Sequence, residues 1–314
     1  MPVLLEVPAD AAGMRLDRFL ATHVAGTTRA RCRRLIVEGA VRVNGRRARK
    51  GQLLDGGDRV EVTGPLPTDA ALRPVPEPDQ PLEVVHADAH LVVVVKPAGT
   101  RTQPLRAGEH GTVASALVAR FPDCADAAPD PRDAGLAQRL DRGTSGLLVA
   151  ARTRAAWEHL RAAFRQGEVE KLYLALVTGT PPGPLTVEAA IGPCPGDRRR
   201  VVASTDPAAA ARPGTLPART EVEVVRPLAG AALVRARTRT GRRHQIRAHL
   251  AAAGYPLLGD QLYGGGVDAP ATAVAGYFLH AAQVTLPHPA DRRLVTFTAP
   301  LPDEFARTVA ALAG

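Results

Sequence analysis

The sequence predicts an α+β protein of two domains, and three observations support this fold class. The chain has 314 residues, of which 45% are apolar, so it is long for one domain and rich enough in apolar residues for a real core. Apolar residues recur at helical spacing in some segments and alternate as in strands in others. A Pro-rich segment, residues 66–81, is typical of an extended linker. We therefore expect a small domain at residues 1–65 and a large one at residues 82–314.

The composition limits the classes of partner and compartment. A formal net charge of +9 favours a polyanionic partner, although a basic charge alone does not separate nucleic acid from other anionic surfaces. Three widely spaced cysteines argue against a disulfide framework and against a zinc site. No segment has the roughly 18 apolar residues that a membrane span needs. We expect a cytoplasmic protein that binds no metal and enters no membrane.

The small domain reads as two helices and a few short strands. A strand is expected at residues 3–7, and residues 15–20 place three large apolar side chains at helical spacing. Thr27 and Thr28 are candidate N-caps for a second helix that ends at Gly39. Strands at residues 41–43 and 60–62 follow, the first of them running into the hairpin dipeptide Asn44-Gly45.

Basic residues crowd the second helix and the hairpin. Four arginines within six positions repel one another, so an anion is expected to compensate their charge, and phosphates do so with release of counterions. A solvated basic surface without a partner is the alternative interpretation. The residues concerned are Arg29, Arg31, Arg33 and Arg34 in the helix and Arg46, Arg47, Arg49 and Lys50 after the turn.

The large domain alternates between strand and helix patterns. Residues 96–99, Lys-Pro-Ala-Gly, by themselves predict only a turn, residues 124–135 a surface loop and residues 179–215 an irregular connection. Strands are expected at residues 82–85, 91–95, 147–151, 168–179, 220–226 and 232–238, and helices at residues 112–120, 154–166 and from Gly241 onward.

A polar loop leads directly into the buried strand at residues 147–151. Arg139 and Arg142 flank Asp141, and a carboxylate beside guanidinium groups is held ionised. An ionised, rigidly seated aspartate can act as a nucleophile or as a base. A surface charge cluster would also account for these four residues taken alone.

The segment that begins at Gly241 carries a second concentration of basic residues. If a helix starts there, its free backbone N–H groups favour an anion, and Arg243 and Arg247 lie one turn apart on the same face. A phosphate or a carboxylate is expected beside them. An exposed basic helix without a ligand is the alternative.

Residues 139–148, Arg-Leu-Asp-Arg-Gly-Thr-Ser-Gly-Leu-Leu, resemble the catalytic loop of the RluA/RluD family of RNA pseudouridine synthases, whose aspartate is essential. The resemblance continues in Lys-Pro-Ala-Gly, in Lys-x-Tyr-x-Ala-x-Val-x-Gly of residues 171–179 and in Gly-Arg-x-His-Gln-Ile-Arg-x-His-Leu of residues 241–250. It spans most of residues 82–302 in the expected order. Gln138 departs from the family, which usually has His there. The resemblance implies a mixed, mainly antiparallel sheet and isomerisation of uridine to pseudouridine, with no cofactor and no metal.

The same resemblance assigns roles to particular residues. Asp141 would attack the anomeric carbon or remove a ribose proton, and the residues alone do not choose between these routes. Tyr173 would stack on the uracil and is a candidate general base, and Arg247 would pair with Asp141. The supporting loop residues are Arg139, Leu140, Arg142, Thr144, Ser145 and Gly146, and further RNA contacts are expected from Arg242, Arg243, His244 and Gln245.

The N-terminal part resembles the S-four RNA-binding domain, first described in a ribosomal protein. Two helices followed by Val-Arg-Val-Asn-Gly and by a Gly-Asp-Arg-Val strand carry this resemblance over about residues 15–62. The domain order implies large-subunit ribosomal RNA as the substrate, with transfer RNA as an alternative, and we expect a monomer. A catalytically silent RNA-binding or ribosome-assembly protein and a carboxylate-dependent hydrolase are the other classes.

Overall fold

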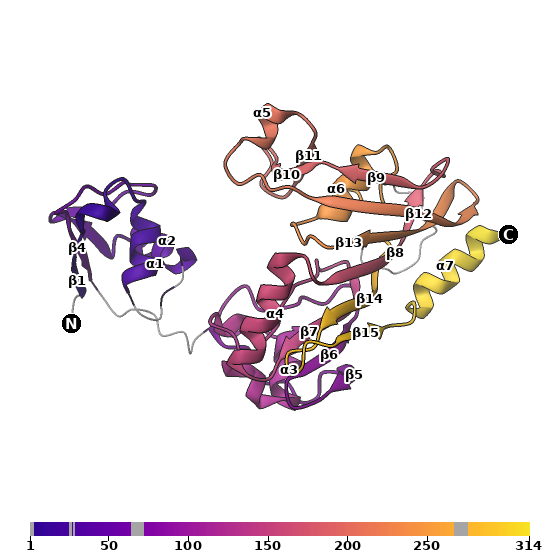
Figure 1. Cartoon of the computed structure of the whole chain (residues 1–314), viewed down its shortest axis with the longest axis horizontal. Helices are drawn as coiled ribbons and strands as arrows, with labels where there is room; N and C mark the ends of the chain where they lie inside the picture. The colour runs from indigo at the N-terminus through magenta and orange to yellow at the C-terminus, as the bar shows by residue number, and fades with distance from the viewer. Residues whose placement is uncertain (1–2, 25–26, 28, 64–71, 267–275) are drawn as a thin grey trace. The chain divides into compact units, whose positions relative to one another are not determined.

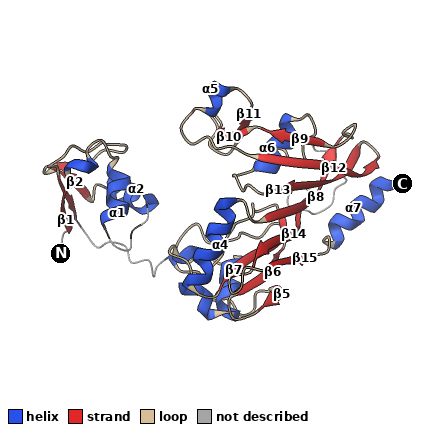
Figure 2. Ribbon diagram, viewed as in Figure 1, coloured by secondary structure: helices blue, strands red, loops and turns tan. Residues whose placement is uncertain are grey.

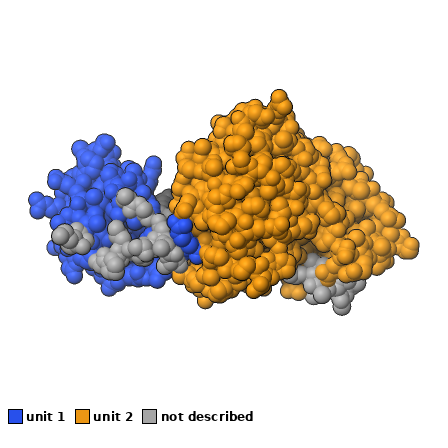
Figure 3. Space-filling view, turned by 90° about the horizontal axis from the view of Figure 1, so that it is seen from below, with its two compact units in different colours: residues 1–73 blue, residues 74–314 orange. Residues whose placement is uncertain are grey.

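The computed structural model describes residues 3–24, 27, 29–63, 72–266 and 276–314 of the chain (Figure 1). The chain divides into two compact units, residues 1–73 (unit 1) and residues 74–314 (unit 2), which Figure 3 colours separately. Each unit is described by itself. Helices and strands occur in both, so the expected α+β class is confirmed (Figure 2).

Unit 1 is an antiparallel sheet with two helices. The helices α1 (Leu16–His23) and α2 (Arg29–Glu38) pack Phe19, Leu35 and other apolar side chains against the sheet in one core. Asn44 and Gly45 form the expected turn, both with positive φ of 52° and 76°, as a tight hairpin requires. The strands lie in the order β1 (Val3–Glu6), β4 (Arg59–Val62), β2 (Val41–Val43) and β3 (Arg46–Arg47).

The charge of α2 is compensated within the protein, at least in part. Arg31, expected to contact phosphate, is buried at 7% exposure. Arg33 donates from Nε to the buried Asp17 at 2.7 Å, and Arg34 pairs with Glu38 one turn later at 2.6 Å. Thr28 lies outside the described residues, as does the side chain of Arg29. Carboxylates of the protein itself therefore compensate Arg33 and Arg34, and contact of these arginines with RNA stays a prediction.

Unit 2 is built on a nine-stranded mixed sheet. All pairings are antiparallel except that of β7 with β14, so the sheet is mainly antiparallel, as expected. The strand order is β5 (Glu83–Ala87), β6 (Leu91–Lys96), β7 (Ser145–Ala151), β14 (Leu279–Pro287), β8 (Glu170–Thr178), β13 (Ala231–Thr238), β12 (Arg219–Leu228) and β9 (Leu185–Glu188), with β15 (Leu294–Thr298) also pairing with β14.

Helices cover both faces of this sheet. Alternate residues of β7 pack in opposite directions: Leu147 joins the cluster of α4 (Arg154–Gln166), and Leu148 joins that of α3 (Val113–Arg120). Strand β8 is covered in the same way by α6 (Gln245–Ala252) and α7 (Asp303–Ala313), through Ala175 and Leu176 respectively. A strand buried on both faces is continuously apolar, which is why β7 is recognisable in the sequence.

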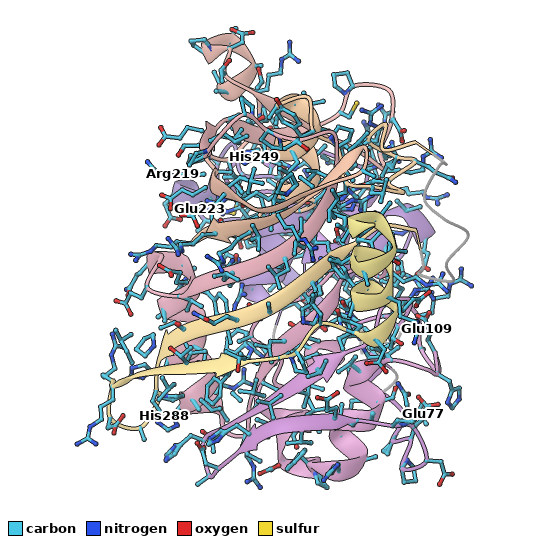
Figure 4. All side chains as sticks on the ribbon, turned by 90° about the vertical axis from the view of Figure 1, so that its right-hand side faces the viewer. Glu77, Glu109, Arg219, Glu223, His249 and His288 are labelled. Carbon is cyan, nitrogen blue, oxygen red and sulfur yellow. The ribbon has the colours of Figure 1, made fainter. Side chains whose placement is uncertain are left out.

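Three expectations about connections are corrected. Residues from Pro74 on belong to unit 2, because Glu77 accepts hydrogen bonds from the N–H of Gly111 at 2.7 Å and from His110 at 3.1 Å (Figure 4). Residues 124–135 include the buried Cys124 and two 3-10 turns, so they are more than a surface loop. The connection at residues 179–215 contains β9, β10 (Ala190–Pro193), β11 (Val201–Ser204) and α5 (Pro207–Ala210).

Gly146 allows β7 to lie directly beside β14. Its φ is +111°, and a Cβ built on it would lie 2.3 Å from the carbonyl oxygen of Ala281. Only glycine fits this conformation and this space. The parallel pairing of Gly146 with Ala281 fixes the position of the loop that ends at Ser145.

Candidate active site

The loop that carries Asp141 is held by the loop after β6. Thr102 Oγ1 donates to the carbonyl of Leu140 at 2.8 Å and accepts from its N–H at 3.2 Å. The carbonyl of Arg142 accepts from the N–H of Gly99 at 2.8 Å, and Arg142 Nε donates back to the Gly99 carbonyl at 2.8 Å. Both neighbours of Asp141 are thus fixed by backbone contacts, while its own side chain stays 31% exposed.

Lys96 is fully buried beneath this junction. Its Nζ donates to the carbonyls of Pro97 at 2.9 Å, Thr100 at 2.7 Å and Arg142 at 3.0 Å. Burial lowers the pKa of Lys96 to about 7, and the charge of Asp141 opposes the shift. The Lys-Pro-Ala-Gly segment is therefore more than the turn expected from its sequence: its lysine ties the two loops together.

Arg247 lies between two carboxylates. Its Nη1 is 3.4 Å from Asp141 Oδ2, and its Nε and Nη2 lie 2.7 and 2.9 Å from the two oxygens of the buried Asp260. The guanidinium carbon also lies 4.3 Å from the ring centre of Tyr277 and 5.0 Å from that of Tyr263. Although burial opposes the charge, the hydrogen bonds to Asp260 raise the pKa of Arg247. A fixed positive charge therefore faces Asp141.

Helix α6 begins at Gln245 and not at Gly241 as expected. Its N-cap residue, His244, has the left-handed φ of 52°. The ring of His244 lies with Nε2 3.8 Å from Asp141 Oδ2 and Nδ1 3.0 Å from the hydroxyl of Tyr263. Burial lowers the pKa of His244, and Arg247 and Arg243 act in the same direction.

Tyr173 lies in β8, between β13 and β14, and is 9% exposed. Burial and then the charge of Asp141 raise the pKa of Tyr173 above its ordinary value. A phenol in this environment stays protonated at neutral pH. The geometry thus suits Tyr173 to stacking and hydrogen-bond donation and disfavours a phenolate base.

Two other residues of the Asp141 loop form hydrogen bonds to residues at or next to β14. Thr144 Oγ1 lies 3.2 Å from the hydroxyl of Tyr277, and Ser145 Oγ lies 2.9 Å from His280 Nδ1. Arg139 is exposed. Within the described chain Asp141 pairs with Arg247 and His244. The cations beside its carboxylate are therefore not Arg139 and Arg142, as expected from the sequence.

The basic segment before α6 is largely bound to the protein itself. Arg242 Nε donates to the carbonyl of Pro217 at 3.0 Å, and Arg243 Nη2 donates to that of Arg198 at 2.8 Å. Gln245 is 5% exposed, and its Nε2 donates to Thr238 Oγ1 at 2.8 Å and Thr220 Oγ1 at 3.1 Å. An RNA contact from the Gln245 side chain is therefore excluded in this conformation. The expectation that Arg243 and Arg247 share a helix face is wrong, because α6 begins at Gln245 and Arg243 precedes it.

Reasoning from the sequence missed four residues that shape the site: Asp260, Tyr263, Tyr277 and Lys96. Asp260 and Tyr263 lie within residues 82–302, over which the resemblance extends, but it assigns them no role. A lone acid close to an essential arginine was a usable signal for Asp260. The sequence gives no signal for Tyr277, because its contact with Arg247 depends on where β14 begins in the fold.

The described part of the chain contains no group of three or more His, Cys, Asp or Glu side chains that could hold a metal ion. None of its helices is long and apolar enough to cross a membrane.

Two family models match the chain. The model described as RNA pseudouridylate synthase matches residues 90–252, which include Asp141, Tyr173 and Arg247, and the S4 domain model matches residues 14–60 in unit 1.

Curated relatives extend over nearly the whole chain. Ribosomal large subunit pseudouridine synthase D of Neisseria meningitidis is 34% identical, covering 98% of this chain and 81% of that protein. The protein of the same name from Nitrosomonas europaea is 35% identical, covering 98% and 87%. An uncharacterized RNA pseudouridine synthase of Chloroflexus aurantiacus is 38% identical, covering 94% and 89%.

Among solved structures, human RNA Pseudouridylate Synthase Domain Containing 1 is similar, with a TM-score of 0.56 and 26% identity over 71% of this chain and 84% of that one. The fold, the two family models and the whole-length relatives agree. This chain belongs to the RNA pseudouridylate synthase family and carries an S4 domain near its N-terminus.

Proposed function

We propose that this protein isomerises specific uridines to pseudouridine in large-subunit ribosomal RNA. The observation that carries the proposal is the position of Asp141: it is partly exposed, held on both sides by backbone contacts and faced by the buried guanidinium of Arg247 at 3.4 Å. Family membership supplies the reaction class, and relatives named for the large ribosomal subunit support the substrate.

The reaction breaks the bond from the ribose anomeric carbon to uracil N1, turns the base, and joins the same carbon to C5, which then loses its proton. Asp141 acts as an anion, either by attacking the anomeric carbon or by removing a ribose proton. Arg247 fixes the position of this carboxylate, because Asp260 and two tyrosine rings hold the guanidinium. Tyr173, as a neutral phenol, packs against the detached base while it turns.

The target base must leave its stack to reach Asp141. Flipping costs a few kcal/mol, which contacts to the RNA backbone offset. We propose that unit 1 recruits the RNA and that unit 2, which begins at Pro74, carries out the chemistry. The exposed cations Arg46, Arg49 and Lys50 of unit 1 support this division. We further propose a cytoplasmic monomer.

Two other interpretations compete with this one. A catalytically silent RNA-binding or ribosome-assembly protein gains support from Gln138, which replaces the expected His and donates from Nε2 to the carbonyl of Leu147 at 3.3 Å. A hydrolase would use the aspartate but would leave the S4 domain unexplained. Transfer RNA is the alternative substrate.

The decisive experiment uses RNA in which uridine carries tritium at C5. An isomerase releases tritium to water without cutting the RNA chain. A hydrolase breaks a bond of the RNA irreversibly, and a binding protein does neither. Ribosomal and transfer RNA are tested separately, and mapping of pseudouridine in cells that lack the gene identifies the position. Absence of tritium release from every RNA would overturn the proposal.

A further inference from the structure

We propose that His244 is a positioning residue for Asp141, held in one orientation by Tyr263. The inference rests on the proposed function and changes the role expected from the sequence, in which His244 contacts RNA. It is carried by the chain of contacts from Val201 through Tyr263 and His244 to Asp141.

The backbone at His244 is arranged to present its side chain. Its φ of 52° is unfavourable for a residue with a Cβ, by roughly 1 kcal/mol or more, yet the chain has His here and not glycine. The ring is 14% exposed and lies between Asp141 on one side and Tyr263 on the other. A histidine meant only to touch RNA phosphates would need neither this backbone conformation nor this burial.

The contacts also choose the tautomer of the ring. The N–H of Val201 donates to the hydroxyl oxygen of Tyr263 at 3.0 Å, and we infer that the Tyr263 hydroxyl donates in turn to His244 Nδ1, 3.0 Å away. A neutral imidazole with Nδ1 as acceptor carries its proton on Nε2. In this tautomer the nitrogen that carries the proton is the one that lies 3.8 Å from Asp141 Oδ2.

Burial, together with Arg247 and Arg243, keeps the ring in the neutral form. Asp141 and Asp260 favour the imidazolium, whereas burial, Arg247 and Arg243 oppose it more strongly and lower the pKa of His244. Arg247 therefore supplies the full positive charge beside Asp141, and His244 supplies a single N–H donor. A contact of 3.8 Å is longer than a hydrogen bond, and such contacts in active sites commonly shorten when substrate is bound.

The first test separates positioning from RNA binding. His244→Gly removes the ring and relieves the positive φ, so the loop keeps its conformation. We expect kcat for tritium release to fall about 10- to 100-fold, as for a misplaced reactive group, with RNA affinity within about twofold of wild type. His244→Gln, which restores an N–H at similar reach, should recover part of kcat. A loss of affinity with kcat unchanged would return His244 to the role of an RNA contact.

The second test asks whether Tyr263 acts through His244. Tyr263→Phe should lower kcat several-fold in the wild-type background and have little further effect in His244→Gly. Additive losses would mean that Tyr263 serves the fold alone, and the inference would then fail. Wild-type turnover and an inactive Asp141→Asn variant, measured in parallel, test the proposed function itself, so the two failures can be told apart.

Discussion

Arg247 binds Asp260 through two hydrogen bonds, of 2.7 and 2.9 Å, and approaches Asp141 with its remaining terminal nitrogen at 3.4 Å. The guanidinium is thus fixed by a buried carboxylate other than Asp141. Asp260 is 1% exposed at its side chain and Asp141 31%, so the inner carboxylate is structural and the outer one is accessible. The division of tasks between the two acids predicts different outcomes for the same substitution.

Asp141→Asn should abolish isomerisation and leave RNA affinity within a few-fold, because it removes the charge and keeps the shape. The free energy of unfolding should change by less than about 0.5 kcal/mol, as for most partly exposed positions. Tritium release and filter binding measure the two properties. Turnover near that of wild type would contradict the assignment of Asp141.

Asp260→Asn should destabilise the protein by about 3 kcal/mol, since it leaves a buried guanidinium with one poorly aligned partner. The pair of Asn variants forms a matched comparison: urea unfolding should separate them clearly, although both lose turnover. If Asp260→Asn unfolds like wild type, Arg247 does not depend on Asp260 for its place.

Arg247→Ala should also damage catalysis strongly, and full activity of that variant would assign the pairing to another cation.

The fold could be predicted from the sequence where one local pattern decides the structure. Helix α4 begins and ends where the apolar spacing predicts, and all residues of β7, including its apolar run at residues 147–151, are buried. The start of α6 could not be predicted, because His244 leaves the helical region through contacts with Tyr263 and Asp141, which come from distant parts of the chain. The burial of Arg31 could not be predicted either, because an arginine next to the apolar residues of a helix gives no local sign of how deeply its side chain lies in the fold.

The candidate site shows the same limit. The residues that the family motifs contain were found, and Arg247 does reach Asp141. The residues that hold Arg247 belong to other segments, and the sequence offers a signal for Asp260 but none for the tyrosine beneath the guanidinium. Tyr277, which precedes β14, illustrates this: its ring lies under the guanidinium through the strand order of the sheet.

Gly146→Ala should destabilise unit 2 by about 3 kcal/mol or more, because a methyl group would overlap the Ala281 carbonyl at a φ that only glycine adopts readily. Gly183→Ala is the matched control, since nothing lies within 4 Å of a Cβ there and its φ is not positive. Urea unfolding of both variants measures the difference. Equal stabilities would show that β7 and β14 can separate at Gly146 without cost.

The stability of unit 2 should fall as the pH drops below about 6.5, the ordinary pKa of a histidine. Burial lowers the pKa of His249 and of His280, although a hydrogen bond to a backbone carbonyl opposes the shift in each case (His249 is labelled in Figure 4). Well above this pH both rings are neutral whether folded or unfolded, so stability is complete. Below it the unfolded chain takes up protons first, which costs up to about 1.4 kcal/mol per pH unit for each histidine. His249→Gln should flatten the dependence of unfolding free energy on pH between about 5.5 and 6.5, and an unchanged slope would contradict this account.

The test of unit 1 must avoid the arginines that stabilise it. Arg31 is buried, and Arg33 binds the buried Asp17, so replacing them would unfold the unit as well as remove charge. Arg46, Arg49 and Lys50 are exposed and follow the hairpin turn. Replacing these three residues therefore tests phosphate contacts without removing the contacts that stabilise α2.

Replacing Arg46, Arg49 and Lys50 together by Ala should weaken RNA binding and barely change turnover at saturating RNA. Each lost phosphate contact should reduce the slope of log K against log salt by about 0.7 to 0.9. The matched control removes three exposed arginines of unit 2, Arg165, Arg226 and Arg293, and an equal loss of affinity there would mean that binding follows net charge only. A short stem-loop should respond less than a long structured RNA, because it offers unit 1 little to hold. A collapse of the saturated rate with an unchanged salt slope would show that unit 1 takes part in the chemistry and not in recruitment.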